Sequence, residues 1–283
     1  MLTITTCRTW PDPPLSLQEL ARLLQERHGI SVKSDIWQNR PAAPFVLPLC
    51  AWDYAAEPQA FAAWLQEAEK AGSRFANPPA LMRWNMHKSY LPGLAAAGTA
   101  VIPTAILPAE ARLIVQTMRQ NGWHEAVLKP AVGQSGRHVV RIRAGRPLPD
   151  LHPYRQGAVL QPFIRSVENK GEISLVFFNG RFSHAVCRQP AANEWRANSA
   201  YGATVFPAAP PDYALAAAAR TLSALPEIPV YARVDGIPAE GRFLLGELEL
   251  IEPTLYLDTA PGAAERFAGV LADWIHQKET APG

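Results

Sequence analysis

Over the first 80 residues, apolar positions alternate between short runs typical of β-strands and the spacing of amphipathic helices. Residues 2–7, 31–37 and 43–54 are the β-type runs. Residues 16–29, with a serine N-cap and a glycine stop, and residues 57–72 predict helices. Each helix has an apolar face: Leu17, Leu20, Leu23 and Leu24 in the first, and Phe61, Trp64, Leu65 and Ala68 in the second. Strands that alternate with helices of this length predict a parallel sheet in an α/β lobe.

The pattern changes after residue 80. We predict one continuous helix over residues 81–98, a short strand at 99–103 and a further helix at 108–121. Long segments that resemble antiparallel strands follow, at residues 126–142, 157–164, 171–189, 231–237 and 243–253. The chain is therefore predicted to be a small α/β lobe followed by an α+β body of two subdomains.

The second subdomain carries the strongest local signal. Asn179-Gly180 lies between two apolar runs and predicts a two-residue hairpin. Helices at 211–224 and 261–278 are predicted to cover the resulting sheet.

Composition narrows the class of protein. The chain has 283 residues, 48% of them hydrophobic, which is ample for a sizeable core, and its formal net charge of +2 is too balanced to indicate a nucleic-acid or membrane-surface partner. No apolar run approaches the roughly 20 residues that span a bilayer. Three distant cysteines predict a reduced, soluble, cytoplasmic protein. The sequence leaves a homodimer open.

One loop carries candidate chemistry. Lys129-Pro130 and residues 133–136, Gly-Gln-Ser-Gly, lie between two strand-like segments. Backbone N–H groups in such a loop can converge on phosphate oxygens, and a nearby lysine neutralises their charge. The order differs from a P-loop, because the lysine precedes the glycines and a strand follows. Arg137 breaks the GxSxG pattern of a hydrolase. An ordinary glycine hairpin would have a similar sequence, so the residues downstream must distinguish a phosphate-binding loop from a hairpin without a ligand.

From about residue 85 to its end, the chain resembles the ATP-grasp family. The resemblance implies two α+β subdomains that clamp ATP, at residues 85–160 and 161–283, behind a Rossmann-like pre-ATP-grasp lobe at residues 1–84. Segments such as "FANPPALMRWNMHKSYL" and "ELELIEPTLYLD" are similar to the ATP-grasp subgroup that contains the cycloserine ring-closing ligase.

The resemblance also implies nucleotide contacts. Two lysines would reach the phosphates and adenine, a glycine loop would cover the phosphates, and hinge residues would meet the adenine edge. Glutamine replaces the usual glutamate of the hinge and can still accept through its amide oxygen. A glutamate would bind the ribose hydroxyls. The matching residues are Lys88, Lys129, Gly133, Gln134, Ser135, Gly136, Gln161, Phe163, Ile164 and Glu172.

A second group of residues matches the catalytic and metal positions of the family. "WRANSAYGA" resembles a lid loop, so Arg196 and Asn198 would face the triphosphate. Arg188 and Arg233 fit arginines that stabilise the transferred phosphoryl group. The metal ligands would be Asp235, Glu247 and Glu249.

Two departures from the family concern this second group. Glu249 stands where the family usually has asparagine, and Ser174 stands where related members often have arginine. Glu247 and Glu249 share one side of a strand by period 2, and their repulsion favours a cation between them. Oxygen donors of this kind suit two Mg²⁺ ions, with Mn²⁺ as a substitute.

These matches imply an ATP-dependent ligase that activates a small carboxylate (an amino acid, a peptide or a related metabolite) as an acyl phosphate for attack by a nitrogen nucleophile. Two alternatives stay open: an ATP-grasp kinase that stops at the phosphorylated product, and an ATP-binding protein without turnover. Glu252 precedes Pro253 and could bind substrate or serve the structure.

Overall fold

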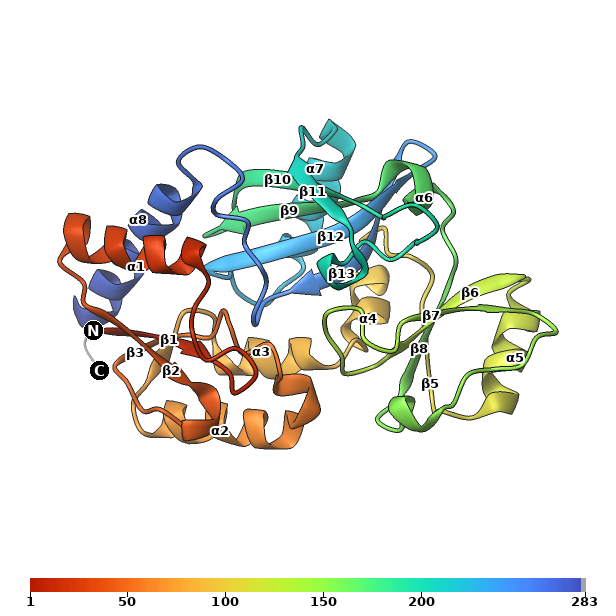
Figure 1. Cartoon of the computed structure of the whole chain (residues 1–283), viewed down its shortest axis with the longest axis horizontal. Helices are drawn as coiled ribbons and strands as arrows, with labels where there is room; N and C mark the ends of the chain where they lie inside the picture. The colour runs from red at the N-terminus through yellow and green to blue at the C-terminus, as the bar shows by residue number, and fades with distance from the viewer. Residues whose placement is uncertain (281–283) are drawn as a thin grey trace.

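The computed structural model describes residues 1–280, which form three sheets and their covering helices (Figure 1). The N-terminal sheet is parallel, in the order β2-β1-β3-β4. Its strands are β1 (Leu2–Thr6), β2 (Val32–Ile36), β3 (Phe45–Leu47) and β4 (Arg74–Phe75). The helices α1 (Leu15–His28) and α2 (Pro58–Lys70) connect them. The predicted α/β lobe with a parallel sheet is confirmed.

The first helix differs from its prediction at the N-terminus. α1 begins at Leu15, and its N-cap is Pro14, without a side-chain cap, rather than Ser16. Proline fixes an extended approach to the helix, and its carbonyl accepts the first backbone hydrogen bonds, from Leu17 and Gln18. The predicted stop at Gly29 is confirmed, because Gly29 adopts the left-handed conformation at φ 66°.

The predicted helix over residues 81–98 is wrong in one respect, because it is two helices: α3 (Pro79–Met86) and α4 (Tyr90–Ala96). At the break, His87 is extended and the N–H of Lys88 donates to the carbonyl of Ala131, 2.8 Å away, instead of to a helical carbonyl. This non-local contact turns Lys88 out of the helix line toward the centre of the molecule.

The middle sheet is antiparallel, in the order β5-β8-β6-β7. Its strands are β5 (Ala105–Leu107), β6 (Glu125–Pro130), β7 (Val140–Arg143) and β8 (Ala158–Pro162), and α5 (Ala111–Gln120) packs against them. The predicted strand at residues 99–103 is wrong: only Val101 makes an isolated bridge, to Leu245, and the strand begins at Ala105.

The C-terminal sheet is antiparallel, in the order β11-β10-β9-β12-β13. Its strands are β9 (Glu172–Phe178), β10 (Arg181–Gln189), β11 (Thr204–Pro207), β12 (Tyr231–Ala239) and β13 (Arg242–Glu249). Asn179 and Gly180 both have positive φ, which confirms the predicted two-residue hairpin.

Helices cover both faces of this sheet (Figure 1). The helix α7 (Asp212–Ser223) packs on the face of Leu175 and Phe177, while α8 (Ala263–Thr280) packs on the face of Val176 and Phe178. Alternate residues of β9 thus enter two different cores, as the two-residue period of a strand requires. The two helices predicted to cover this sheet are confirmed, and α8 also packs along α1.

The shared core of α1, α8 and β9 fixes the N-terminal sheet against the C-terminal one. The short helix α6 (Ser166–Lys170) and the 3₁₀ helices η1 (Trp37–Asn39), η2 (Tyr54–Ala56), η3 (His152–Tyr154) and η4 (Ser199–Tyr201) complete the described elements. None of the helices within residues 1–280 is long and apolar enough to cross a bilayer.

Candidate active site

One pocket lies where the three sheets meet. Nearly all of the residues singled out in the sequence line it: Lys88, Lys129, Gly133, Gln134, Ser135, Gly136, Gln161, Phe163, Ile164, Glu172, Arg188, Arg196, Asn198, Glu247 and Glu249. Arg233 and Asp235 lie beneath its floor, at 4% and 1% exposure. The fold therefore brings residues from five separate sequence segments (88, 129–136, 161–172, 188–198 and 233–249) to one place, and their individual roles stay predictions.

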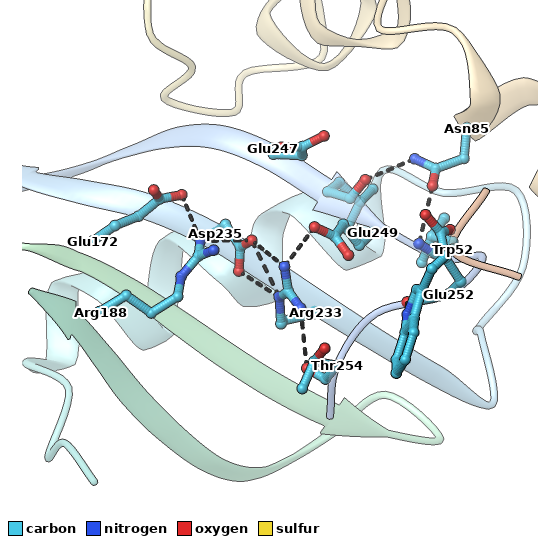
Figure 2. Close-up of polar contacts among 12 residues, drawn as sticks. Trp52, Asn85, Glu172, Arg188, Arg233, Asp235, Glu247, Glu249, Glu252 and Thr254 are labelled. Atoms are coloured by element: carbon cyan, nitrogen blue, oxygen red, sulfur yellow. Dashed lines mark hydrogen bonds and ion pairs between the residues drawn. The ribbon is translucent and has the colours of Figure 1, made fainter. Parts of the chain in front are cut away.

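A row of alternating charges forms the floor of this pocket (Figure 2). It runs from Glu172 on β9 through Arg188 on β10 to Asp235 on β12, with N–O distances of 2.8 Å and 2.9 Å. Arg233 continues it, 2.9 Å from Asp235 and 2.5 Å from Glu249 on β13. The four adjacent strands β10, β9, β12 and β13 each contribute at least one of these charged side chains. The register of the sheet therefore determines which charges lie next to each other.

Burial makes this row energetically demanding, because isolated charges are costly away from water. The two arginines hold the pKa of Asp235 below its usual range despite its burial. Burial instead raises the pKa of Glu249 to about 7, although Arg233 acts in the opposite direction. Asp235 is thus saturated by two guanidinium groups, while Glu249 at the open end is the weaker acid.

The two candidate phosphate lysines have different partners. The Nζ of Lys88 donates to the carbonyl of Gly133 at 2.7 Å and pairs with Glu247 at 3.0 Å, so it ties the glycine loop to β13. Lys129, at the end of β6, has no acidic side chain within ion-pair distance in the part of the chain described here. Burial lowers the pKa of Lys129, while Glu247 and Glu172 favour its charge. A half-buried cation without an ion-pair partner suits an anionic ligand.

The glycine loop touches the segment predicted to be a lid. At Gly136, φ is +68°, and an added Cβ would lie 2.6 Å from Oδ1 of Asn198. The hydroxyl of Tyr201 donates to the carbonyl of Gly136 at 3.0 Å. Arg196 pairs with Glu194 at 2.7 Å and stacks on Tyr201, 3.5 Å from the ring centroid. Gly136 is required for two reasons: a Cβ atom would clash with Asn198, and glycine adopts a left-handed backbone without strain.

The hinge segment presents one open acceptor. Gln161 is 2% exposed, and its amide nitrogen donates to the hydroxyl of Thr104 at 2.9 Å. Its amide oxygen has no partner within residues 1–280 and belongs to the pocket wall. Phe163 packs edge-on against Trp195, with ring centroids 5.6 Å apart. An acceptor beside an apolar wall is the arrangement that an adenine amino group and ring require.

Sequence reasoning missed the residues that hold β13 in place. β13 is an edge strand, and Asn85 of α3 serves as its missing neighbour: it donates to the carbonyl of Leu248 and accepts from the N–H of Leu250, at 2.8 Å and 2.9 Å. The hydroxyl of Tyr90 in α4 also donates to Leu248, at 3.0 Å. An asparagine on the otherwise apolar face of the predicted helix was the available signal.

The three predicted metal ligands differ in how many carboxylate oxygens they could offer to a divalent cation. Glu247 and Glu249 each use one carboxylate oxygen in an ion pair and keep the other free of partners within residues 1–280. Both oxygens of Asp235 accept from guanidinium groups. Among the described residues, no three His, Cys, Asp or Glu side chains form a ready cage. The two glutamates suit Mg²⁺, which keeps several ligands from water or phosphate.

Comparison with known proteins agrees with this geometry. Residues 2–77 match the family profile of the D-cycloserine synthetase DcsG N-terminal domain, and residues 94–215 match the prokaryotic glutathione synthetase ATP-grasp domain. The chain is 30% identical over 268 residues to the cycloserine biosynthesis protein DcsG of Streptomyces lavendulae, covering 84% of each.

Solved structures give the same result. The crystal structure of D-cycloserine synthetase DcsG superposes with a TM-score of 0.85 at 26% identity, over 97% of this chain and 99% of that one. The ATP complex of D-alanine–D-alanine ligase from Bacillus anthracis has a TM-score of 0.70 at 14% identity, over 98% and 99%. The latter likeness concerns the fold alone.

Proposed function

The chain belongs to the DcsG-like ATP-grasp ligases and is an ATP-dependent carboxylate–amine ligase, and we propose that the pocket described above activates a small amino acid, peptide or related metabolite as an acyl phosphate. The observation that carries this proposal is the row of charges beneath the pocket, with Lys88 and Lys129 facing it. The likeness to the cycloserine biosynthesis protein DcsG supports the amino-acid character of the substrate.

Different residues of the pocket would bind different parts of the nucleotide. The open oxygen of Gln161 and the backbone near Phe163 and Ile164 would meet adenine, and Glu172 would bind the ribose. Lys129, the glycine loop and, with the lid closed, Arg196 and Asn198 would surround the triphosphate. Glu247 and Glu249 would hold Mg²⁺, which when bound neutralises phosphate charge. A metal role for Asp235 requires Arg188 and Arg233 to release at least one of their contacts.

The reaction then needs positioning and charge compensation more than a nucleophilic side chain. A carboxylate oxygen of the substrate attacks the γ-phosphorus, ADP leaves, and the amine displaces phosphate from the acyl carbon. Arg188 and Arg233 would stabilise the negative charge on the transferred phosphoryl group. Rotation of either guanidinium would exchange one of its carboxylate partners for a phosphate oxygen. Fixed charges in a site shielded from water provide most of the rate in such transfers.

A screen of ADP release tests the proposal. Amino acids and dipeptides are supplied singly and in pairs with Mg·ATP, with Lys129→Met as the variant that lacks the unpaired phosphate cation. We expect ADP release from wild type only when an acid and an amine are both present. ADP release that no acid or pair stimulates would refute the proposed activity.

A further inference from the structure

Glu252 differs from the other acidic residues of the pocket. Glu172, Glu247 and Glu249 each pair with a lysine or arginine, whereas no such cation within residues 1–280 lies at ion-pair distance from Glu252. Glu252 nonetheless is only 9% exposed and lines the pocket. Its carboxyl group is therefore a buried acid without an ion-pair partner among the described residues, and Glu252 belongs to the wall of the pocket where a ligand would bind.

The backbone around Glu252 is held rigidly. Five side-chain hydrogen bonds anchor residues 250–254. The N–H of Leu250 donates to Asn85 at 2.9 Å, and its carbonyl accepts from Asn77 at 2.9 Å. The carbonyls of Ile251, Glu252 and Thr254 accept from Tyr231 at 2.7 Å, Trp52 at 2.9 Å and Arg233 at 3.0 Å, respectively. They come from both the N-terminal lobe and the C-terminal sheet (Figure 2). A loop fixed on both sides of an unpaired side chain is preorganised for binding rather than for packing.

The surroundings of Glu252 indicate the sign and kind of its ligand. Burial, with Glu249 and Glu247 nearby, raises the pKa of Glu252 well above its usual range, although Lys88 acts in the opposite direction, so a cation bound beside this carboxylate would offset that cost. Tyr54 lines the same pocket, and the indole nitrogen of Trp52 donates to the backbone carbonyl of Glu252. A carboxylate and an aromatic side chain in the wall of one pocket suit an organic ammonium group, which gains from both.

The position of Glu252 indicates which substrate would carry this group. In the charge row, Glu172 lies at one end and Glu252 lies beyond Glu249 at the other (Figure 2). If Glu172 binds the ribose, then the triphosphate extends toward Glu247 and Glu249, and Glu252 lies past its γ-phosphate end. The acid that receives this phosphate must occupy that end.

We propose that Glu252 binds the ammonium group of the carboxylate substrate, so that the ligase selects an amino acid or amino-acid derivative with a free amine over a simple carboxylic acid. This inference rests on the proposed function, because it places the acid at the γ-phosphate end. It adds a specificity residue that the nucleotide and metal positions do not require.

The test compares binding of amino acids and their deaminated counterparts to the protein loaded with Mg²⁺ and the imido analogue of ATP. The probes are D- and L-amino acids, each beside the same acid without its amine, titrated by thermal shift. We expect at least one amino acid to bind wild type more than about tenfold tighter than its deaminated partner, as one charge-assisted contact allows. Glu252→Gln should remove this preference and leave the deaminated acid within about twofold.

Two further variants keep the result interpretable. Glu252→Asp keeps the charge on a shorter side chain and should retain the preference at lower affinity. Glu227→Gln, at an exposed position, should match wild type. The inference is overturned if Glu252→Gln and Glu252→Asp both keep the full preference, if wild type shows none, or if no amino acid binds. Amine-dependent binding without any acid-stimulated ADP release would instead refute the proposed function and leave the inference standing.

Discussion

Arg233 and Asp235, two residues apart on β12, contact each other through both carboxylate oxygens, at 3.0 Å from Nε to Oδ1 and 2.9 Å from the terminal nitrogen to Oδ2. Period 2 places both side chains on one face of the strand. Arg188 joins Asp235 from β10, so this carboxylate bridges two buried guanidinium groups, each of which also pairs with a glutamate, Glu172 or Glu249. The stability of the C-terminal sheet and the reactivity of the site therefore depend on the same contact.

Asp235→Asn should destabilise the fold. The substitution leaves Arg188 and Arg233 buried with less compensation, and removal of one partner from a buried pair costs about 3–5 kcal/mol. Urea denaturation measures this loss. Glu67→Gln, which breaks the exposed ion pair with Arg40, should cost less than about 1 kcal/mol. Equal effects of the two substitutions would show that the buried row does not support the fold.

Gly136→Ala should impair closure of the lid. An added Cβ would lie 2.6 Å from Oδ1 of Asn198, so the glycine loop and the segment at 195–203 must move apart. The matched control is Gly145→Ala, which has a similar φ of +75° but no atom within 4 Å of the added Cβ. We expect kcat/KM to fall at least tenfold for Gly136→Ala alone, with faster hydrogen exchange in 195–203. Similar losses in both variants would assign the effect to backbone strain.

Glu249→Ala should raise the Mg²⁺ concentration required for half-maximal activity about tenfold or more. Glu249 keeps one carboxylate oxygen free toward the pocket, and Glu249→Asn should restore much of the activity because its amide supplies an oxygen ligand. The measurement is activity across a Mg²⁺ titration. Curves for Glu249→Ala that match wild type would remove Glu249 from the metal site.

His184 should make the stability of the C-terminal sheet depend on pH. Burial lowers the pKa of His184, whose Nε2 lies 2.9 Å from the carbonyl of Leu255, and nearby Arg266 lowers this pKa further. Because the unfolded chain then binds the proton more readily, this contribution is present above about pH 6.5 and is lost as pH falls below it. His184→Gln should flatten the stability profile between pH 7 and 5. An unchanged slope in urea titrations would contradict this origin.

The sequence predicted most elements because their causes are local. The repeats of leucines in α1, the alternation in β9 and the Asn179-Gly180 turn each act over a few residues. Two of the failures involve distant partners: Lys88 leaves its helix for Ala131, and Val101 bridges Leu245 instead of forming a strand. No spacing within one segment specifies such contacts.

The residues of the candidate site could likewise be predicted from the sequence, whereas their contacts with distant residues could not. The family resemblance supplied the residues that line the pocket, because their order along the chain matches the family's order. It did not reveal that Asp235 is saturated by arginines or that Asn85 completes the edge of β13. The resemblance left the role of Glu252 undecided. Only the fold shows that its carboxyl group has no ion-pair partner among the described residues while its backbone is held by hydrogen bonds.

The fate of one oxygen atom tests the central claim most directly. If the pocket transfers the γ-phosphoryl group to a substrate carboxylate, and an amine then displaces it, one carboxylate oxygen must leave with the phosphate. The acid identified by the ADP-release screen is labelled with ¹⁸O in its carboxyl group and turned over with Mg·ATP and the amine. We predict inorganic phosphate that carries one ¹⁸O per molecule. Unlabelled phosphate, or a phosphorylated product that accumulates without releasing phosphate, would contradict the account.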